Sequence, residues 1–390
     1  MSEACHQEGA IGVTGPLPRP RGALAALEPY IPGRSAEEVM ERFHIRTVIK
    51  LGSNENPLGL SPRVRRALIR SLDRIHHYPD GDCTRLRERL AERLGLSPGH
   101  FCVANGVDNV LTCVGLAYLD AGDRCVVGAP TYTAYVGLAR LLGAIPVEVP
   151  LRDWRYDVQA TVAAAAGAKA VIVCNPNNPT GSALRHDEVQ ELLERIRPEV
   201  LVVLDEAYAE WADDPGFPDS VALLRRHPNL MVLRTFSKIY GLAGLRVGYA
   251  IAAPEIIGAL NQVREPFPVD RLAQAAAEAV LDDKAYVRAS FENNRRGKAA
   301  LAKAFTGLGL RHLPSQANFI LVNLERPAAE VAERLLERGV IIRPGGMWKL
   351  PTWARVTIGT PAQNAHVVAA LASVLEKTRR GRPRARGGRR

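Results

Sequence analysis

The sequence lacks long apolar runs and paired cysteines, and aromatic residues make up only 6% of its 390 residues. Its six cysteines stand singly, at Cys5, Cys83, Cys102, Cys113, Cys125 and Cys174. None has C-x-x-C or zinc-ligand spacing, so we predict reduced, buried thiols and no metal site. No stretch approaches the ~18 apolar residues of a membrane span, and residues 1–20 lack the hydrophobic core of a secretion signal. These absences predict a cytoplasmic protein without membrane contact.

Acidic residues are missing from the C-terminal end of the chain. From Lys377 to Arg390 eight residues are basic and none is acidic, so most of the net charge of +10 lies there. The segment is rich in Gly, Pro and Arg, a composition that predicts a disordered tail over 378–390. Such a tail could touch RNA or anionic surfaces without sequence preference. We favour a solubilising extension with no specific nucleic-acid partner.

The remaining composition is that of a globular protein, with 47% hydrophobic and 24% charged residues. Its length predicts more than one domain. Short apolar runs alternate with helical patterns such as 132–142 and 186–196, which indicates crossover connections and a mainly parallel sheet. The predicted strands of this sheet are 124–127, 170–174, 200–204, 231–234 and 247–251.

From about residue 281 the pattern changes to longer helical stretches around two strands. The predicted helices are 285–308, 328–338 and 363–377, and the predicted strands are 319–324 and 355–358. The fold class is therefore α/β, a large domain with a mainly parallel sheet between helices, plus a smaller α+β domain. We divide the chain into a disordered arm (1–26), an arm with part of the small domain (27–55), the large domain (56–280), the small domain (281–377) and the tail (378–390).

In open parallel sheets ligands bind beyond the carboxyl ends of the strands, so the residues that follow each strand are candidates for the site. Asp205 follows the run 200–204, and a carboxylate there is costly to bury unless it meets a cation. Lys238 follows the strand 231–234 and two hydroxyl residues. Burial or nearby positive charge would make its amine a nucleophile. With Arg246 eight residues on, the hydroxyls suit a phosphate.

Two further motifs follow or precede predicted elements. The turn N-P-N-N-P-T-G at 175–181 is rigid and would place the Asn178 amide accurately. Gly106 precedes a helical pattern, where backbone N–H groups can point at an anion. Each motif alone has an ordinary structural explanation, because strand-end acids also cap helices or bind magnesium and most Ser-Lys pairs lie in surface turns.

The order of these motifs is far more specific than any one of them. A glycine turn, an aromatic residue, N-P-x-N-P-T-G, D-x-A-Y, S-K and a distal arginine follow one another between residues 106 and 246. In this order the chain resembles the fold-type I pyridoxal-phosphate aminotransferases, and within them the histidinol-phosphate aminotransferase family. The resemblance spans about residues 27–377 and includes E-P-Y-I-P-G (28–33), S-N-E-N-P-L-G (53–59), H-Y-P-D (77–80), Q-A-N-F (316–319) and R-V-T-I-G-T (355–360).

The resemblance implies the catalytic roles. Lys238 would hold pyridoxal 5′-phosphate as a Schiff base and then move the proton between the substrate Cα and the cofactor C4′. Asp205 would pair with the pyridinium nitrogen and keep the ring an electron sink. Tyr208 and Asn178 would hydrogen-bond the phenolic oxygen of the ring, and Tyr132 would stack on its face.

The same resemblance implies the phosphate and substrate contacts. The cofactor phosphate would be held by Gly106, Val107, Asp108, Thr235, Ser237 and Arg246, and by Tyr78 from a second subunit, which makes the enzyme an obligate homodimer. The substrate would meet Asn54, Arg343, Arg355 and the partner subunit's Tyr30. The expected reaction transfers an amino group between glutamate and an imidazole-acetol phosphate or an aromatic 2-oxo acid.

Two departures from the family pattern leave the substrate open. Val107-Asp108-Asn109 stands where the family has Ser-Asp-Glu, which removes one hydroxyl and keeps the backbone donors. The segment 345–351 contains Trp348, which would narrow the substrate pocket, stack on an aromatic ring or pack between the domains. A tailoring aminotransferase and a decarboxylase of the same fold, such as a threonine-phosphate decarboxylase, stay as alternatives.

Overall fold

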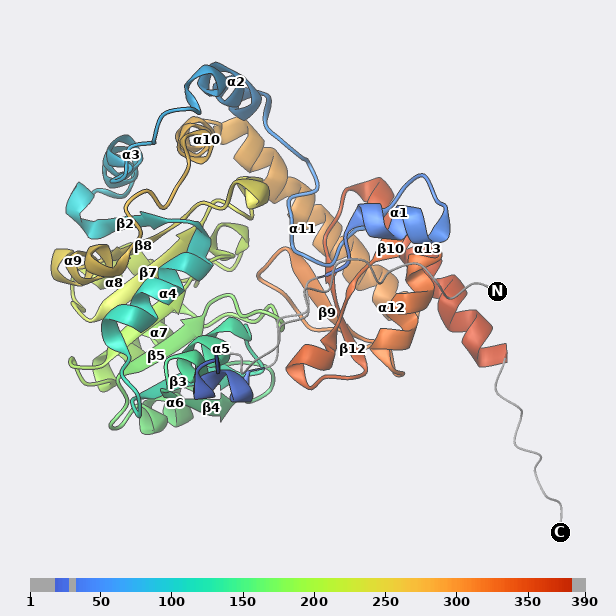
Figure 1. Cartoon of the computed structure of the whole chain (residues 1–390). Helices are drawn as coiled ribbons and strands as arrows, with labels where there is room; N and C mark the ends of the chain where they lie inside the picture. Colours follow the sequence, from blue (N-terminus) through green and yellow to red (C-terminus); the bar gives the residue numbers. More distant parts are fainter. Residues whose placement is uncertain (1–17, 28–32, 381–390) are drawn as a thin grey trace, which may run out of the picture.

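The computed structural model describes residues 18–27 and 33–380, which form two lobes joined by a long helix and by the segment 51–61 (Figure 1). Cys5, Tyr30 and the residues beyond 380 lie outside the described residues, so the predicted buried thiol, substrate contact and disordered tail stay predictions. The other five cysteines are buried and free, as predicted. No helix in the described part of the chain has the length and apolarity of a membrane span.

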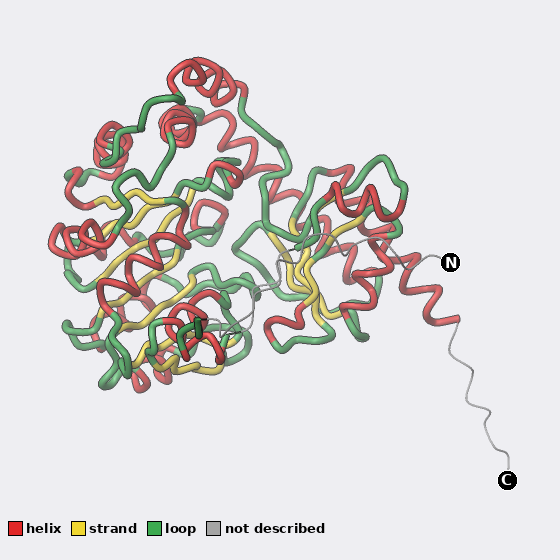
Figure 2. The backbone as a smooth tube through the Cα atoms, viewed as in Figure 1, coloured by secondary structure: helices red, strands yellow, loops and turns green. Residues whose placement is uncertain are grey.

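The large lobe is built on a seven-stranded sheet of order β2-β8-β7-β6-β5-β3-β4. Figure 2 shows its strands in yellow with helices around them. Its strands are β2 (Phe101–Ala104), β3 (Arg124–Ala129), β4 (Ile145–Pro150), β5 (Ala170–Cys174), β6 (Leu201–Asp205), β7 (Leu230–Thr235) and β8 (Gly248–Ala252). The pairs from β4 to β7 are parallel, and β8 runs antiparallel to both of its neighbours. The mainly parallel sheet is confirmed.

Helices cover both faces of this sheet because its central strands are apolar on both sides. In β5, Val171 and Val173 pack into one cluster, whereas Ala170 and Ile172 pack into the other. One layer holds α2 (Pro62–Ser71), α3 (Thr84–Leu94), α6 (Val158–Ala164), α7 (His186–Arg195), α8 (Ser220–Leu224) and α10 (Arg271–Leu281). The other holds α4 (Gly106–Tyr118), α5 (Ala134–Leu141) and α9 (Pro254–Val263).

The small lobe is an α+β unit with its own core. An antiparallel sheet of order β11-β12-β9 packs against α11, α12 and α13. The bounds are β9 (Phe319–Asn323), β11 (Arg343–Pro344), β12 (Trp353–Thr357), α11 (Lys284–Gly307), α12 (Ala328–Leu336) and α13 (Pro361–Arg380). The N-terminal segment joins this lobe through α1 (Ala36–Phe43) and through β1 (Ile49–Lys50), which pairs with β10 (Val340–Ile341).

Three features differ from the sequence expectation. Strands β2 and β4 were not predicted, and β4 carries Pro146 and Pro150, which an edge strand tolerates. Residues Gly22–Ala26 form a 3-10 helix that contacts α5, within the arm expected to be disordered. Helix α13 continues to Arg380, so the first three residues of the expected tail are helical.

Candidate active site

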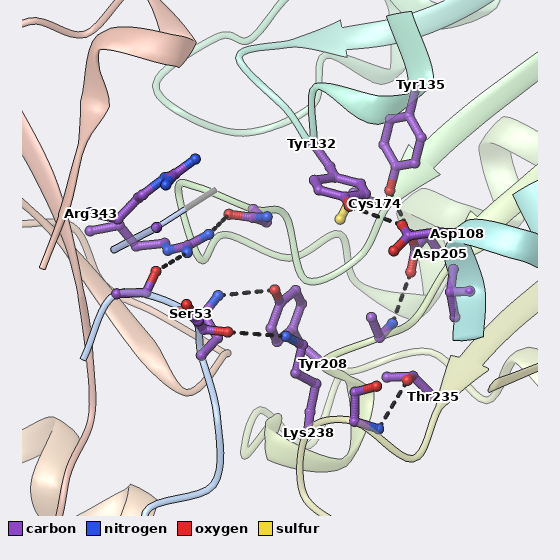
Figure 3. A pocket seen from close by; sticks show the side chains of 18 of the residues that line it. Ser53, Asp108, Tyr132, Tyr135, Cys174, Asp205, Tyr208, Thr235, Lys238 and Arg343 are labelled. Atoms are coloured by element: carbon purple, nitrogen blue, oxygen red, sulfur yellow. Dashed lines mark hydrogen bonds between the residues drawn. The ribbon is translucent and has the colours of Figure 1, made fainter. Parts of the chain in front are cut away.

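A pocket of about 180 Å³ lies where β5, β6 and β7 end and the small lobe faces the sheet (Figure 3). The residues after the strands and the loop at 52–54 meet there because parallel strands place their carboxyl ends at one edge. It is lined by these residues expected from the sequence: Asn54, Val107, Asp108, Tyr132, Asn178, Asp205, Tyr208, Thr235, Ser237, Lys238, Arg246, Arg343 and Arg355.

Lys238 projects into this pocket from the turn that follows β7 (Figure 3). Its Nζ donates to the Ser53 carbonyl oxygen at 3.4 Å and lies 5.5 Å from the centre of the Tyr208 ring. Burial, and then the positive charge of Arg355, lower the pKa of Lys238 from 10.5 to about 8. A large fraction of this lysine is therefore a neutral amine at mildly alkaline pH, the form that attacks a carbonyl carbon.

Asp205 ends β6 and is almost fully buried. Its Oδ2 accepts a hydrogen bond from the Tyr135 hydroxyl at 2.6 Å, and its Oδ1 accepts one from the Ala207 backbone N–H at 3.0 Å. Burial outweighs these hydrogen bonds and raises the pKa of Asp205 to about 6. A buried carboxylate of this kind is stabilised by a cation placed against it, such as a protonated ring nitrogen.

A candidate phosphate site, here called the phosphate cup, lies at the start of α4 and is formed by Gly106, Thr235, Ser237 and Arg246. Gly106 has φ +80° there, and an added Cβ would stand 2.8 Å from Nη2 of Arg246. The Arg246 guanidinium lies 3.5 Å from the Ser237 hydroxyl, and the Ser237 backbone N–H donates to the Thr235 hydroxyl at 3.0 Å. Backbone donors at a helix N-terminus, two hydroxyls and a guanidinium together bind phosphate well.

Tyr132 closes one side of the pocket. Its hydroxyl donates to Oδ1 of Asp108 at 2.9 Å, and its ring meets the Tyr135 ring edge-on at 5.5 Å. Asp108 also lies 3.4 Å from the Arg246 guanidinium. The ring of Tyr132 is thereby tied to the phosphate cup.

The small lobe contributes Arg355, which is buried. Nη1 donates to Oδ1 of Asn178 at 2.5 Å, and Nη2 donates to the Gly52 carbonyl at 2.8 Å. The rings of Phe319 and Trp348 lie 5.3 Å and 5.2 Å from the guanidinium carbon. Trp348 thus packs against the candidate substrate arginine, which the sequence left open.

Asn54 connects the two lobes beside Lys238. Its Nδ2 donates to the Tyr208 hydroxyl at 3.0 Å, and its Oδ1 accepts from the Thr357 hydroxyl at 3.0 Å. Asn54 has φ 58°, a conformation that asparagine adopts more readily than most residues. Arg343 and Arg355 are directly opposite each other on the antiparallel strands β11 and β12.

Among the described residues, Tyr78 is expected in the site and lies outside the pocket, and other lining residues were missed. The Tyr78 ring is 79% exposed and lies on Phe267 outside the pocket. Tyr30 is outside the described residues. Tyr135 was missed because its position in a helical pattern resembles that of a core residue. Cys174 lines the pocket without a sequence signal, and Ser53, the first residue of the 53–59 motif, lines it without having been assigned a role.

The pocket fits pyridoxal 5′-phosphate, because Asp205 needs a cation and a Cβ at residue 106 would fill the cup. With the parallel sheet, these features define a fold-type I pyridoxal-phosphate enzyme. The aminotransferase class I and II family model matches residues 46–371. The chain belongs to this family, and within it to the histidinol-phosphate aminotransferase family.

Curated relatives match nearly the whole chain. It is 46% identical over 361 residues to the histidinol-phosphate aminotransferase of Moorella thermoacetica. The alignment covers 92% of this chain and 94% of the relative. The histidinol-phosphate aminotransferase of Symbiobacterium thermophilum is 46% identical over 356 residues, with 91% and 98% coverage.

Solved structures of an aminotransferase and of a decarboxylase share this fold. Histidinol-phosphate aminotransferase from Sinorhizobium meliloti, in complex with pyridoxal-5′-phosphate, superposes with a TM-score of 0.85 at 28% identity, covering 92% of this chain and 98% of that one. L-threonine-O-3-phosphate decarboxylase from Porphyromonas gingivalis superposes with a TM-score of 0.76 at 26% identity, covering 84% and 100%.

Proposed function

We propose that this chain transfers an amino group from glutamate to imidazole-acetol phosphate, with 2-oxoglutarate and histidinol phosphate as the products. The observation that carries the substrate class is the cross-strand pair of Arg343 and Arg355 at the pocket. Like charges directly opposite each other on a sheet are unfavourable, so an anion between them relieves repulsion. A substrate phosphate and the glutamate carboxylate are both suitable anions.

Within this proposal, Lys238 and Asp205, which line the same pocket, would have different roles toward the cofactor. Pyridoxal phosphate supplies an electron sink that lets the Cα–H bond of the substrate break. Lys238 would hold the cofactor and, once the substrate amine has displaced its own amine, would accept the substrate Cα proton and deliver it to the cofactor C4′, a task that suits an amine with a pKa of about 8. Asp205, fixed by Tyr135, keeps the ring nitrogen protonated.

The remaining site residues bind and orient. Tyr132 would cover one face of the cofactor ring, and Asn178 and Tyr208 would hydrogen-bond its phenolic oxygen. The backbone N–H groups of Val107 and Asp108 bind the cofactor phosphate, as do the side chains of Thr235, Ser237 and Arg246 around Gly106. Asn54 keeps the Tyr208 hydroxyl in place through the 3.0 Å hydrogen bond.

We further propose a homodimer with shared active sites. Large apolar side chains are exposed on α2 and on the loops beside it, namely Leu58, Leu60, Ile69, Leu72, Ile75, Tyr78 and Phe267. Exposed large apolar side chains are typical of an interface. The partner subunit's Tyr78 would complete the phosphate cup and the partner subunit's Tyr30 the substrate site. We infer a cytoplasmic enzyme with no specific nucleic-acid partner.

A single-turnover spectral titration tests the substrate. Cofactor-loaded protein is mixed with histidinol phosphate, phenylalanine or glutamate, and the conversion of the cofactor to its pyridoxamine form is followed by absorbance. The proposal predicts conversion by histidinol phosphate and by glutamate. Conversion by phenylalanine and not by histidinol phosphate would contradict the proposed substrate and indicate an aromatic aminotransferase. Release of carbon dioxide from a phosphorylated amino acid without a 2-oxo acid would instead favour the decarboxylase.

A further inference from the structure

The loop that carries Tyr78 is anchored to the chain's own large lobe. Arg271 Nη2 donates to the Tyr78 carbonyl at 2.6 Å, and Gln274 Nε2 donates to the Asp80 carbonyl at 2.8 Å. Both donors come from α10, a helix packed against α2. The backbone on either side of the Tyr78 side chain is therefore fixed before any second subunit binds.

The other side of this loop packs tightly against the segment before α10. Arg264, whose side chain is 8% exposed, donates from Nη1 to the Gly81 carbonyl at 2.7 Å. An added Cβ at Gly81 would stand 2.4 Å from the Pro266 carbonyl oxygen. Only glycine allows this approach, which brings the 266–267 backbone directly beneath the tyrosine loop.

The approach places the Phe267 ring against the Tyr78 ring. Their centroids are 4.6 Å apart with an interplanar angle of 18°, a stacked pair, although Tyr78 is 79% exposed and Phe267 is 48% exposed. The Tyr78 hydroxyl has no hydrogen-bond partner in residues 18–27 and 33–380. The stack therefore adds little to the core of its own subunit, and it fixes the direction of a tyrosine that points away from that core.

We propose that Phe267 is a positioning residue for the shared active site: it holds the Tyr78 ring in the orientation in which its hydroxyl reaches the cofactor phosphate in the second subunit. The inference rests on the proposed homodimer and deepens it. A ring fixed in advance loses no rotamer freedom when it binds, so the phosphate contact becomes stronger without any new interaction. An aromatic pair of this kind shifts an equilibrium roughly 2- to 10-fold.

The test is a double-mutant cycle read by cofactor binding. Apo protein is titrated with pyridoxal phosphate by equilibrium dialysis, and sedimentation velocity reports the oligomeric state of each variant. Tyr78→Phe keeps the ring and removes the hydroxyl. Phe267→Leu keeps an apolar side chain and removes the stack, whereas Phe267→Tyr keeps the stack. Ile145→Ala, at an exposed apolar position on the far edge strand β4, is the matched control.

We expect Phe267→Leu to weaken cofactor binding roughly threefold with the dimer intact, and Phe267→Tyr and Ile145→Ala to bind normally. In the Tyr78→Phe background, Phe267→Leu should add nothing, because the hydroxyl that it positions is gone. Weakening by Tyr78→Phe with none by Phe267→Leu would overturn the positioning role, as would fully additive effects. Normal binding by a dimeric Tyr78→Phe would instead overturn the shared phosphate contact on which this inference rests.

Discussion

Replacing Lys238 with methionine should stabilise the protein when no cofactor is bound. The lysine amine lies in a pocket that lowers its pKa to about 8, so at pH 7 the folded chain carries a charge that its surroundings disfavour. Methionine has a similar length and no charge. The functional lysine at this position therefore lowers the free energy of unfolding, as residues needed for catalysis often do.

The size of the effect follows from the pKa. The displacement from 10.5 to about 8 corresponds to about 3 kcal/mol at 1.36 kcal/mol per pH unit. The side chain is only partly buried, so solvent reduces this to about 2 kcal/mol. Between pH 8 and 10.5 the unfolded chain holds the proton and the folded chain has lost it, so wild-type stability rises with pH. The advantage of Lys238→Met is full below pH 8 and shrinks above it.

The assay is chemical denaturation of the apo proteins at pH 7 and pH 9.5. We expect a higher free energy of unfolding for Lys238→Met at pH 7 and a smaller difference at pH 9.5. Lys50→Met is the control, because the Lys50 amine pairs with Glu55 at 2.7 Å and its removal should give no gain. Equal or lower stability of Lys238→Met at pH 7 would refute the reasoning.

Three further predictions concern turnover. Asp205→Ala should lower turnover roughly 100-fold or more while Lys238 still binds the cofactor, as followed by stopped-flow and absorbance; near-normal turnover would contradict the electron-sink role. Trp348→Ala should raise the KM for both substrates roughly tenfold, because Arg355 loses its contact with the Trp348 ring, whereas Trp348→Phe should change it little. Deleting residues 378–390 should leave turnover unchanged; a large loss that deletion of 381–390 alone does not reproduce would implicate the end of α13.

The sequence predicted the central strands because burial on both faces leaves a continuous apolar run. The run 170–174 matches β5 residue for residue, and β6 is shifted by one from the prediction. Strand β4 escaped prediction because it lies at an edge, with two prolines and an exposed Ile145. The residues of β4 do not by themselves indicate a strand, because its pairing with β3 depends on tertiary structure.

Some residues of the candidate site could likewise be predicted from local patterns, whereas contacts between distant residues could not. Asp205 and Lys238 were found because each follows a strand, and they line one pocket. The hydrogen bond from Tyr135 to Asp205 joins residues that are 70 positions apart, so no local sequence pattern predicts it. Arg343 and Arg355 were taken from a resemblance, and only the pairing of β11 with β12 shows that they lie opposite each other.

The central claim is that Lys238 holds the cofactor. Holoenzyme reduced with sodium borohydride fixes the cofactor covalently to its lysine, and peptide mass spectrometry locates the label. We predict the label on the peptide that contains Lys238 and its absence from the Lys238→Met protein. A label on another lysine, such as Lys50 or Lys298, or no label in protein that has bound pyridoxal phosphate, would contradict the account.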